Sequence, residues 1–279
     1  MPEGDTIFRT ARSLGQWLEG REITAARTTA ATVPAAKLVG QRVTGVEAKA
    51  KHLLIRFDSG MVLHTHMRMT GAWHVYRAGE RWRKPAHQAR VVLEAGERVA
   101  VCFNAPVVEL LAKRGEDVHP ALTRLGPDVL VDPLDLDEVR RRLAARPPSM
   151  AIGEVLLDQQ VVSGIGNIFR CEALFAERVD PWAPWPDLAP ETVDGLVTAA
   201  ARLMRARIAT SPEPAAESTA GPTAGPATMR TRPARPAVYG RTGRPCYRCR
   251  TPIATAKLGQ QARDVYWCPK CQGHLPTIP

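Results

Sequence analysis

The chain has 279 residues, with 38 Lys or Arg against 28 Asp or Glu, so its formal net charge is +10 and its pI is near 9.7. This length excludes a lone small module and allows two or three folded domains. The basic residues are spread along the chain and favour a polyanionic partner. We expect nucleic acid first and an acidic membrane surface second. No apolar run approaches the roughly 20 residues of a spanning helix, and no secretory signal is recognisable, so we expect a cytosolic protein.

The first residues predict a helix that begins almost at the N-terminus. Asp5 and Thr6 offer N-cap oxygens. Apolar residues then recur at helical spacing at Ile7, Ala11, Leu14 and Leu18. Gly20 ends the pattern.

Pro2 becomes the N-terminal residue if the initiator methionine is removed, as is common before a small residue. Its secondary amine can then attack an aldehyde carbon and form an iminium, which is Schiff-base chemistry without a lysine. An α-amino group has a pKa of about 7.7–8.0, so a useful fraction is neutral at physiological pH. Glu3 can transfer protons beside it. Taken alone, these residues are also an ordinary start for any chain.

Between residues 22 and 111 the sequence changes to short, alternating, β-branched runs separated by turns. The pattern predicts an antiparallel sandwich or barrel. The clearest runs are 42–46, 52–57, 61–64 and 90–93, with turns at 58–60 and 95–96.

Beyond Pro127 the apolar periodicity becomes helical, and we expect helices over 136–143, 152–162, 167–178 and 192–208. Gly164 and Gly166 interrupt this pattern just before Asn167. Glycines there let backbone N–H groups approach a phosphate at a helix N-terminus. An ordinary tight turn capped by Asn167 explains the segment equally well. Residues 209–237, rich in Ala, Pro, Thr, Ser and Gly, predict a flexible linker.

Two C-x-x-C pairs lie near the C-terminus, separated by 18 residues. This spacing predicts one structural Zn²⁺ held tetrahedrally by Cys246, Cys249, Cys268 and Cys271, with a hairpin between the pairs. Zinc binding of about 10–16 kcal/mol would stabilise a segment with so little apolar sequence, so we expect it to unfold without metal. Cys102 and Cys171 remain as small buried apolar side chains. The segment is basic, which indicates phosphate contact but does not separate DNA from RNA.

Four motifs occur in one order along the chain: residues 1–4, 50–54, 164–167 and the cysteine pairs. Together they resemble the formamidopyrimidine-DNA glycosylase and endonuclease VIII family, over nearly the whole chain except 209–237. The resemblance implies a multidomain α+β fold with DNA bound between its halves. Its parts would be a catalytic β-sandwich with a leading helix over 1–126, a helix-two-turns-helix domain over 127–208, the linker 209–237 and a zinc finger over 238–275.

The resemblance also implies a bifunctional activity in base excision repair, a DNA glycosylase and lyase. Pro2 would attack C1′ of the damaged nucleotide, displace the base and permit β- and then δ-elimination of the strand. Glu3 matches the family's acid/base carboxylate, and Lys51 matches the strand lysine that contacts phosphate and transfers protons. Arg263 matches the arginine at the tip of the finger hairpin, which grips phosphate beside the lesion.

Further residues match the family's DNA-binding positions. A flipped base leaves a gap in the stack. Met69 matches the side chain that fills the gap, with Arg68 and Thr70 beside it and His66 near phosphate. Alternatively, Met69 packs beneath a β-turn. Asn167 matches the hairpin asparagine that holds backbone phosphate.

Three departures from the family pattern bear on specificity. Residues 103–107 lack the arginine and aromatic residue of the second loop in purine-type members. Thr6 stands where many members have glutamate, and the spacing between the cysteine pairs is slightly wider. The missing second-loop residues, together with Gly4 at the start of the chain, favour the endonuclease VIII branch and oxidised pyrimidines.

The resemblance implies damaged DNA as the partner, no membrane, no nucleotide cofactor, a monomer, and a place in a bacterial-type cytoplasm, associated with the nucleoid. One alternative is a catalytically silent damaged-DNA-binding protein on the same scaffold, against which Pro2, Glu3 and Lys51 argue. A ribosome-associated zinc module would explain the basic charge and the cysteines, but not the N-terminal motif.

Overall fold

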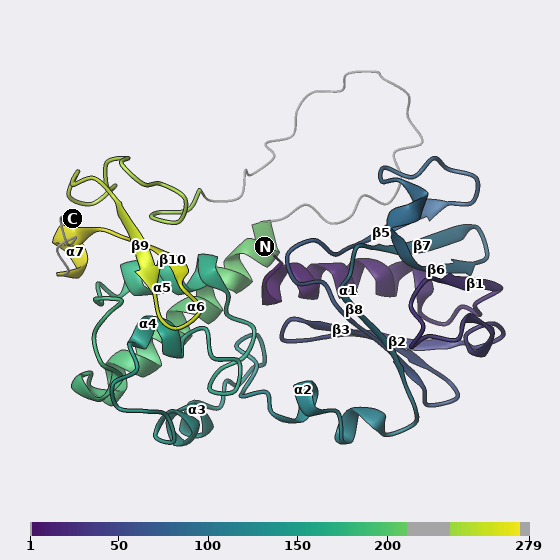
Figure 1. Ribbon diagram of the computed structural model, residues 1–279, viewed down its shortest axis with the longest axis horizontal. Coiled ribbons are helices and arrows are strands. Elements are labelled where there is room, and N and C mark those ends of the chain that lie inside the picture. Colours follow the sequence, from purple (N-terminus) through teal and green to yellow (C-terminus); the bar gives the residue numbers. More distant parts are fainter. Residues whose placement is uncertain (1, 211–234, 274–279) are drawn as a thin grey trace. The chain divides into compact units, whose positions relative to one another are not determined.

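The computed structural model describes residues 2–210 and 235–273. The chain forms two compact units, residues 1–124 and residues 125–279 (Figure 1). Most of the linker expected over 209–237 lies outside the described residues. Among the helices that the structure describes, none is long and apolar enough to cross a membrane.

The first unit contains two four-stranded antiparallel sheets (Figure 1). In spatial order, one sheet comprises β2 (Val43–Lys49), β3 (His52–Phe57), β4 (Val62–His66) and β8 (Val107–Leu111). The other comprises β1 (Ala25–Thr28), β6 (Ala89–Ala95), β7 (Arg98–Phe103) and β5 (Ala72–Arg77). The predicted sandwich is therefore confirmed, and an apolar cluster containing Leu53, Leu63 and Leu93 forms its main core.

Helix α1 (Gly4–Leu18) packs against β2 and contributes its apolar face to this core. The predicted N-cap was wrong, because the cap residue is Glu3, whose backbone carbonyl accepts from the N–H groups of Thr6 at 2.9 Å and Ile7 at 3.1 Å. Asp5 lies inside the first turn and is buried. The helix therefore starts directly after Pro2 and Glu3.

The short helices of the first unit lie in its connections. They are the 3₁₀ turns η1 (Ala35–Lys37), η2 (Ala86–Gln88) and η3 (Gly115–Asp117), and the one-turn helix α2 (Pro120–Thr123).

The second unit contains helices α3 (Leu136–Leu143), α4 (Ile152–Val155), α5 (Asn167–Ala176) and α6 (Pro190–Thr210), with a 3₁₀ turn η4 (Trp185–Asp187). The helix expected over 152–162 was wrong beyond Val155. There the carboxylate of Asp158 accepts from the backbone N–H of Gln160 at 2.9 Å, which stabilises a turn in competition with the helix. The apolar residues that suggested a longer helix fill the core from an irregular segment, as Val161 does.

The C-terminal segment forms the expected hairpin, β9 (Ala254–Leu258) and β10 (Arg263–Trp267), followed by α7 (Pro269–Gln272). The hairpin packs against α5 (Figure 1). Glu172 on α5 accepts from the backbone N–H groups of Ala237, Val238 and Tyr239 at 2.7–2.9 Å. Arg248 donates to the carbonyl of Phe175 at 2.6 Å. The chain is therefore fixed to α5 both at residues 237–239 and at Arg248.

Candidate active site and DNA-binding residues

Pro2 and Glu3 lie immediately before the N-terminal end of α1. Pro2 is half-buried, whereas Glu3 is only 1% exposed. The positive end of the helix dipole lies here, which stabilises a carboxylate and disfavours a protonated amine nearby. The arrangement thus places the Pro2 nitrogen and a shielded carboxylate in adjacent positions.

Lys51 occupies the two-residue turn between β2 and β3, flanked by the pair Lys49 and His52. Ala50, the first turn residue, has a positive φ of 55°, the left-handed conformation that tight hairpins need. Lys51 is half-buried at this turn. Its position is therefore set by the hairpin register rather than by a flexible loop.

The segment after β4 forms a tight loop that exposes Met69. Met67 is buried, but Met69 is 61% exposed, so the alternative that Met69 packs beneath the turn is wrong. A Cβ on Gly71 would lie 2.7 Å from the backbone of Met67, so a glycine is required for the loop to close. Arg68 adopts a positive φ of 42° at the centre of the loop. An apolar side chain is thereby held in solvent by a constrained backbone.

His66 at the start of this loop is neutral at pH 7. Burial lowers its pKa to about 4, and the nearby charges of His64, Lys51 and Arg68 lower it as well. Its Nδ1 accepts from the backbone N–H of Arg68 at 3.1 Å, which assigns the proton to Nε2. His66 is therefore available as a neutral hydrogen-bond donor.

Residues 103–107 expose no arginine or aromatic side chain. Phe103 and Ala105 are fully buried. Asn104 donates from its side chain to Gln88 at 2.9 Å, and its carbonyl accepts from the hydroxyl of Thr70 at 3.1 Å. A hydrogen bond thus joins this second loop to the loop that carries Met69.

In the second unit, Asn167 is the first residue of α5 and is largely buried. Its side-chain amide donates to the carbonyl of Asp264 at 2.8 Å, and its Oδ1 accepts from Arg170. The fully buried Arg170 also donates to the carbonyl of Asp264 at 2.8 Å. The N-terminus of α5 and the finger hairpin are therefore linked directly beside Arg263.

Arg263 is exposed at the start of β10, just after the hairpin tip. The tip is held by Glu154 of α4, which accepts from the backbone N–H of Gln260 at 3.1 Å. Gly259 has a φ of +72°, so a larger residue would be strained there, and its Cβ would push aside the Glu154 side chain that holds the tip.

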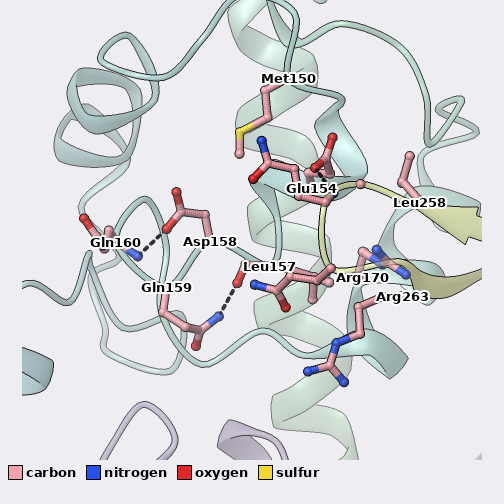
Figure 2. A pocket seen from close by; sticks show the side chains of 12 residues that line it. Met150, Glu154, Leu157, Asp158, Gln159, Gln160, Arg170, Leu258 and Arg263 are labelled. Carbon is pink, nitrogen blue, oxygen red and sulfur yellow. Dashed lines mark hydrogen bonds between the residues drawn. The ribbon is translucent and has the colours of Figure 1, made fainter.

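A pocket of about 410 Å³ lies between α4, the segment after it and the hairpin tip. Figure 2 shows Glu154, Gln159 and Arg263 around this pocket, with Arg170 beside Arg263. Its lining mixes apolar side chains with the two arginines and the carboxylates of Glu154 and Asp158.

The four cysteines of the C-terminal segment converge. Their Sγ atoms all lie within 4.8 Å of one another, with Cys249 and Cys268 at 3.3 Å and Cys246 and Cys271 at 4.0 Å. A tetrahedral zinc with Zn–S bonds of about 2.3 Å requires separations of about 3.8 Å, so the set fits one ion. A hydrogen bond from the Thr251 side chain lowers the pKa of the Cys249 thiol to about 6, whereas burial raises the pKa of the Cys268 thiol and raises that of Cys271 to about 12.

The remaining cysteines, Cys102 and Cys171, are fully buried, as expected. Sequence reasoning missed Arg170, Glu154 and Glu172. Arg170 follows Asn167 by three residues on a helix, a spacing that brings side chains together and offered a signal. Glu154 offered none, because its partner lies 106 residues away.

Comparison with known families accounts for most of the chain. Residues 1–106 match the formamidopyrimidine-DNA glycosylase N-terminal domain, and residues 125–216 match the formamidopyrimidine-DNA glycosylase H2TH domain. A solved structure of a Lactococcus lactis FPG mutant with DNA containing Fapy-dG superposes with a TM-score of 0.79, at 21% identity, over 97% of this chain and 99% of that one. A MutM structure with DNA containing carbocyclic 8-oxo-G gives a TM-score of 0.80 at 20% identity and the same coverage. The predicted α+β fold is confirmed.

Two relatives carry the activity in their names. "Probable endonuclease 8 2" of Streptomyces coelicolor is 38% identical over 98% of this chain and 94% of its own length. "DNA-(apurinic or apyrimidinic site) lyase Nei2" of Mycolicibacterium smegmatis is 35% identical over 98% of this chain and 99% of its own length. These relatives favour an enzyme over the catalytically silent alternative. The chain belongs to the formamidopyrimidine-DNA glycosylase and endonuclease VIII family, and it is a DNA glycosylase and DNA-(apurinic or apyrimidinic site) lyase of base excision repair.

Proposed function

We propose that this enzyme removes oxidised bases, with oxidised pyrimidines favoured, through a Schiff base on Pro2, and that it nicks the strand by β- and δ-elimination. The observation that carries the proposal is the shielded Glu3 carboxylate directly beside the N-terminal proline, at the positive end of α1.

The chemistry needs one nucleophile for both activities. The Pro2 nitrogen, unprotonated, attacks C1′ of the damaged nucleotide, and the base leaves with the electron pair of the glycosidic bond and takes up a proton. The sugar ring opens to an iminium on Pro2. Loss of a C2′ proton then breaks the C3′–O bond, and a second elimination breaks the C5′–O bond. Hydrolysis of the iminium restores the proline.

Glu3 and Lys51 supply the proton transfers and the positive charge. A buried carboxylate beside the reacting sugar transfers protons as the ring opens, a role that typically contributes about 10²–10⁴-fold. Lys51, placed by the tight β2–β3 turn, contacts the phosphate next to the lesion and assists proton transfer. His66, neutral and protonated on Nε2, donates to the same backbone.

Asn167 and Arg263 hold phosphate from the second unit. One amide hydrogen of Asn167 bonds the carbonyl of Asp264, and the second remains to donate to a phosphate oxygen. Arg263, exposed at the hairpin tip, offers a paired guanidinium contact and neutralises charge that develops on the leaving phosphate. Arg68 and Met69 act on the duplex, with Met69 filling the gap left by the flipped nucleotide.

The lesion class follows from the second loop. In residues 103–107 the side chains of Phe103 and Ala105 are buried and Asn104 is bonded to Gln88, so no arginine or aromatic residue enters the duplex there. The names of the endonuclease 8 relatives support the same branch.

The metal of the finger is, in this proposal, one structural Zn²⁺. It would be held by Cys246, Cys249, Cys268 and Cys271, whose separations fit a tetrahedral ion. The ion would supply no reactive group and would fix the hairpin that presents Arg263.

Borohydride trapping on a duplex with an abasic site tests the proposal. The reduced complex is digested, and the peptide that carries the sugar is identified by mass spectrometry. We expect the adduct on the nitrogen of Pro2. A chain with one residue added before Pro2 should give no adduct at the N-terminus, whereas the exposed Glu22→Gln control should trap normally. A sugar adduct on a lysine would overturn the proline mechanism.

A further inference from the structure

Three metal-ligating side chains converge in the first unit, apart from the cysteine cluster. His64 on β4 lies opposite Glu109 on the edge strand β8. His119, just before α2, reaches the same carboxylate. Glu109 Oε2 lies 3.1 Å from His64 Nδ1 and 2.9 Å from His119 Nε2, and all three ligand atoms lie within 4.8 Å of one another.

We propose that His64, Glu109 and His119 bind a divalent transition-metal ion, with Zn²⁺ as the preferred ion. Two imidazole nitrogens and one carboxylate oxygen are a donor set that zinc accepts, with a fourth position open to water. Bonds of about 2.0–2.1 Å place tetrahedral donors about 3.3 Å apart. The two measured separations are within about half an ångström of this value, so small side-chain movements suffice.

The surroundings of His64 complete such a site. Its other ring nitrogen, Nε2, lies 2.8 Å from His52 Nδ1. A metal on Nδ1 requires the proton of His64 on Nε2, where it donates to His52, and metal-bound histidines usually have such a partner. His64 is 1% exposed, so its ring is held in one orientation by packing.

Binding would have two structural consequences. The ion would tie the segment after β8, which carries His119, to the interior strand β4, which carries His64. These two residues are 55 positions apart in the sequence. It would also fix the tautomer of His52, which follows Lys51 and whose ring meets that of His66 edge-on at 4.7 Å. The ion would therefore stiffen the support of the candidate active-site turn without contacting DNA.

Metal stoichiometry of the full chain tests the site. The protein is dialysed against buffered micromolar Zn²⁺ and analysed by atomic emission. We expect about two zinc ions per chain, one beyond the cysteine cluster. His119→Gln and, separately, Glu109→Gln should each lower the number to about one, while the exposed His87→Gln should leave it unchanged. Thermal melting of each variant verifies that it is folded.

Cobalt substitution distinguishes the two sites. Co²⁺ bound by cysteines shows thiolate-to-metal charge transfer in the near ultraviolet and strong d–d bands at long visible wavelengths, whereas Co²⁺ on nitrogen and oxygen shows only weaker d–d bands at shorter visible wavelengths. The wild type should show both sets, and His119→Gln should keep only the thiolate set. A wild-type protein that binds only one ion, or a second ion that survives in both variants, would overturn the proposal.

Discussion

The Asn167 amide donates to the carbonyl of Asp264 at 2.8 Å, which links the first residue of α5 to the strand that begins with Arg263. Asn167 and Arg263, which the sequence separates by 96 positions, are thereby held close to each other. Arg170 strengthens the link from beneath, because it bonds both Asn167 and the same carbonyl. A substitution at Asn167 should therefore alter the position of Arg263, and a change in the hairpin should alter the start of α5.

Asn167→Ala should weaken binding to a duplex that contains a stable abasic analogue by about 10- to 100-fold, since a hydrogen bond to a charged group contributes about 1.5–3 kcal/mol. The dependence on salt should not change, because no charge is removed. Fluorescence anisotropy at several salt concentrations measures both. Gln16→Ala, at an exposed position on α1, serves as the control. Unchanged affinity would show that Asn167 is only a structural cap.

Arg263→Ala should differ from Asn167→Ala in kind. The loss of one phosphate contact should reduce the slope of log affinity against log salt by about 1. The δ-elimination product should also decline relative to the β-elimination product on a sequencing gel. Arg244→Ala, another exposed arginine of the finger, should keep the product ratio. If the ratio of δ- to β-elimination product is the same in both variants, Arg263 takes no part in δ-elimination.

Met69→Ala should leave the melting temperature nearly unchanged, because this side chain is 61% exposed. Excision of a damaged base from duplex DNA should slow by about 10-fold or more, since flipping costs a few kcal/mol that the wedge offsets. Cleavage of a single strand with an abasic site should be spared. Val39→Ala removes a comparably exposed apolar side chain and is the control. Equal loss on both substrates would contradict a wedge.

Glu3→Gln separates the two activities. Excision should fall by about 10²–10⁴-fold, because the amide cannot transfer a proton, while trapping at a preformed abasic site should persist. The uncharged, nearly isosteric side chain keeps the packing of the buried position. Single-turnover rates on a damaged base and on an abasic site give the comparison. If both rates fall together, Glu3 serves the fold or the lyase step instead.

Loss of the finger metal should unfold the finger locally and leave the β-sandwich intact. Cys268→Ser should release zinc and expose Trp267, which is now 1% exposed and meets Trp182 edge-on at 4.6 Å. Tryptophan fluorescence should shift to the red, and tight DNA binding should be lost. Cys102→Ala, in the other unit, is the matched control. Retained metal and affinity in Cys268→Ser would refute the structural role of zinc.

Local pattern predicted the elements whose residues carry their own signal. The strand over 52–57 was predicted with its observed bounds, because its largely apolar run ends at the turn of residues 58–60 and nearly all of its side chains are buried. The helix over 152–162 was not, since the side chain of Asp158 competes for the backbone and the apolar residues of an irregular core segment resemble those of a helix. The exposure of Met69 also needed the loop geometry that Gly71 permits.

The sequence by itself determined which groups are available: a proline beside a carboxylate near the start of the chain, four cysteines in two pairs, and a glycine-bounded helix start at Asn167. Only the tertiary structure decided which distant groups meet. The bonds of Asn167 to Asp264, of Glu154 to Gln260, and the meeting of His64 with His119 depend on strand register and helix packing. Such contacts are absent from any local pattern, because they arise only when separate hydrophobic surfaces are buried together.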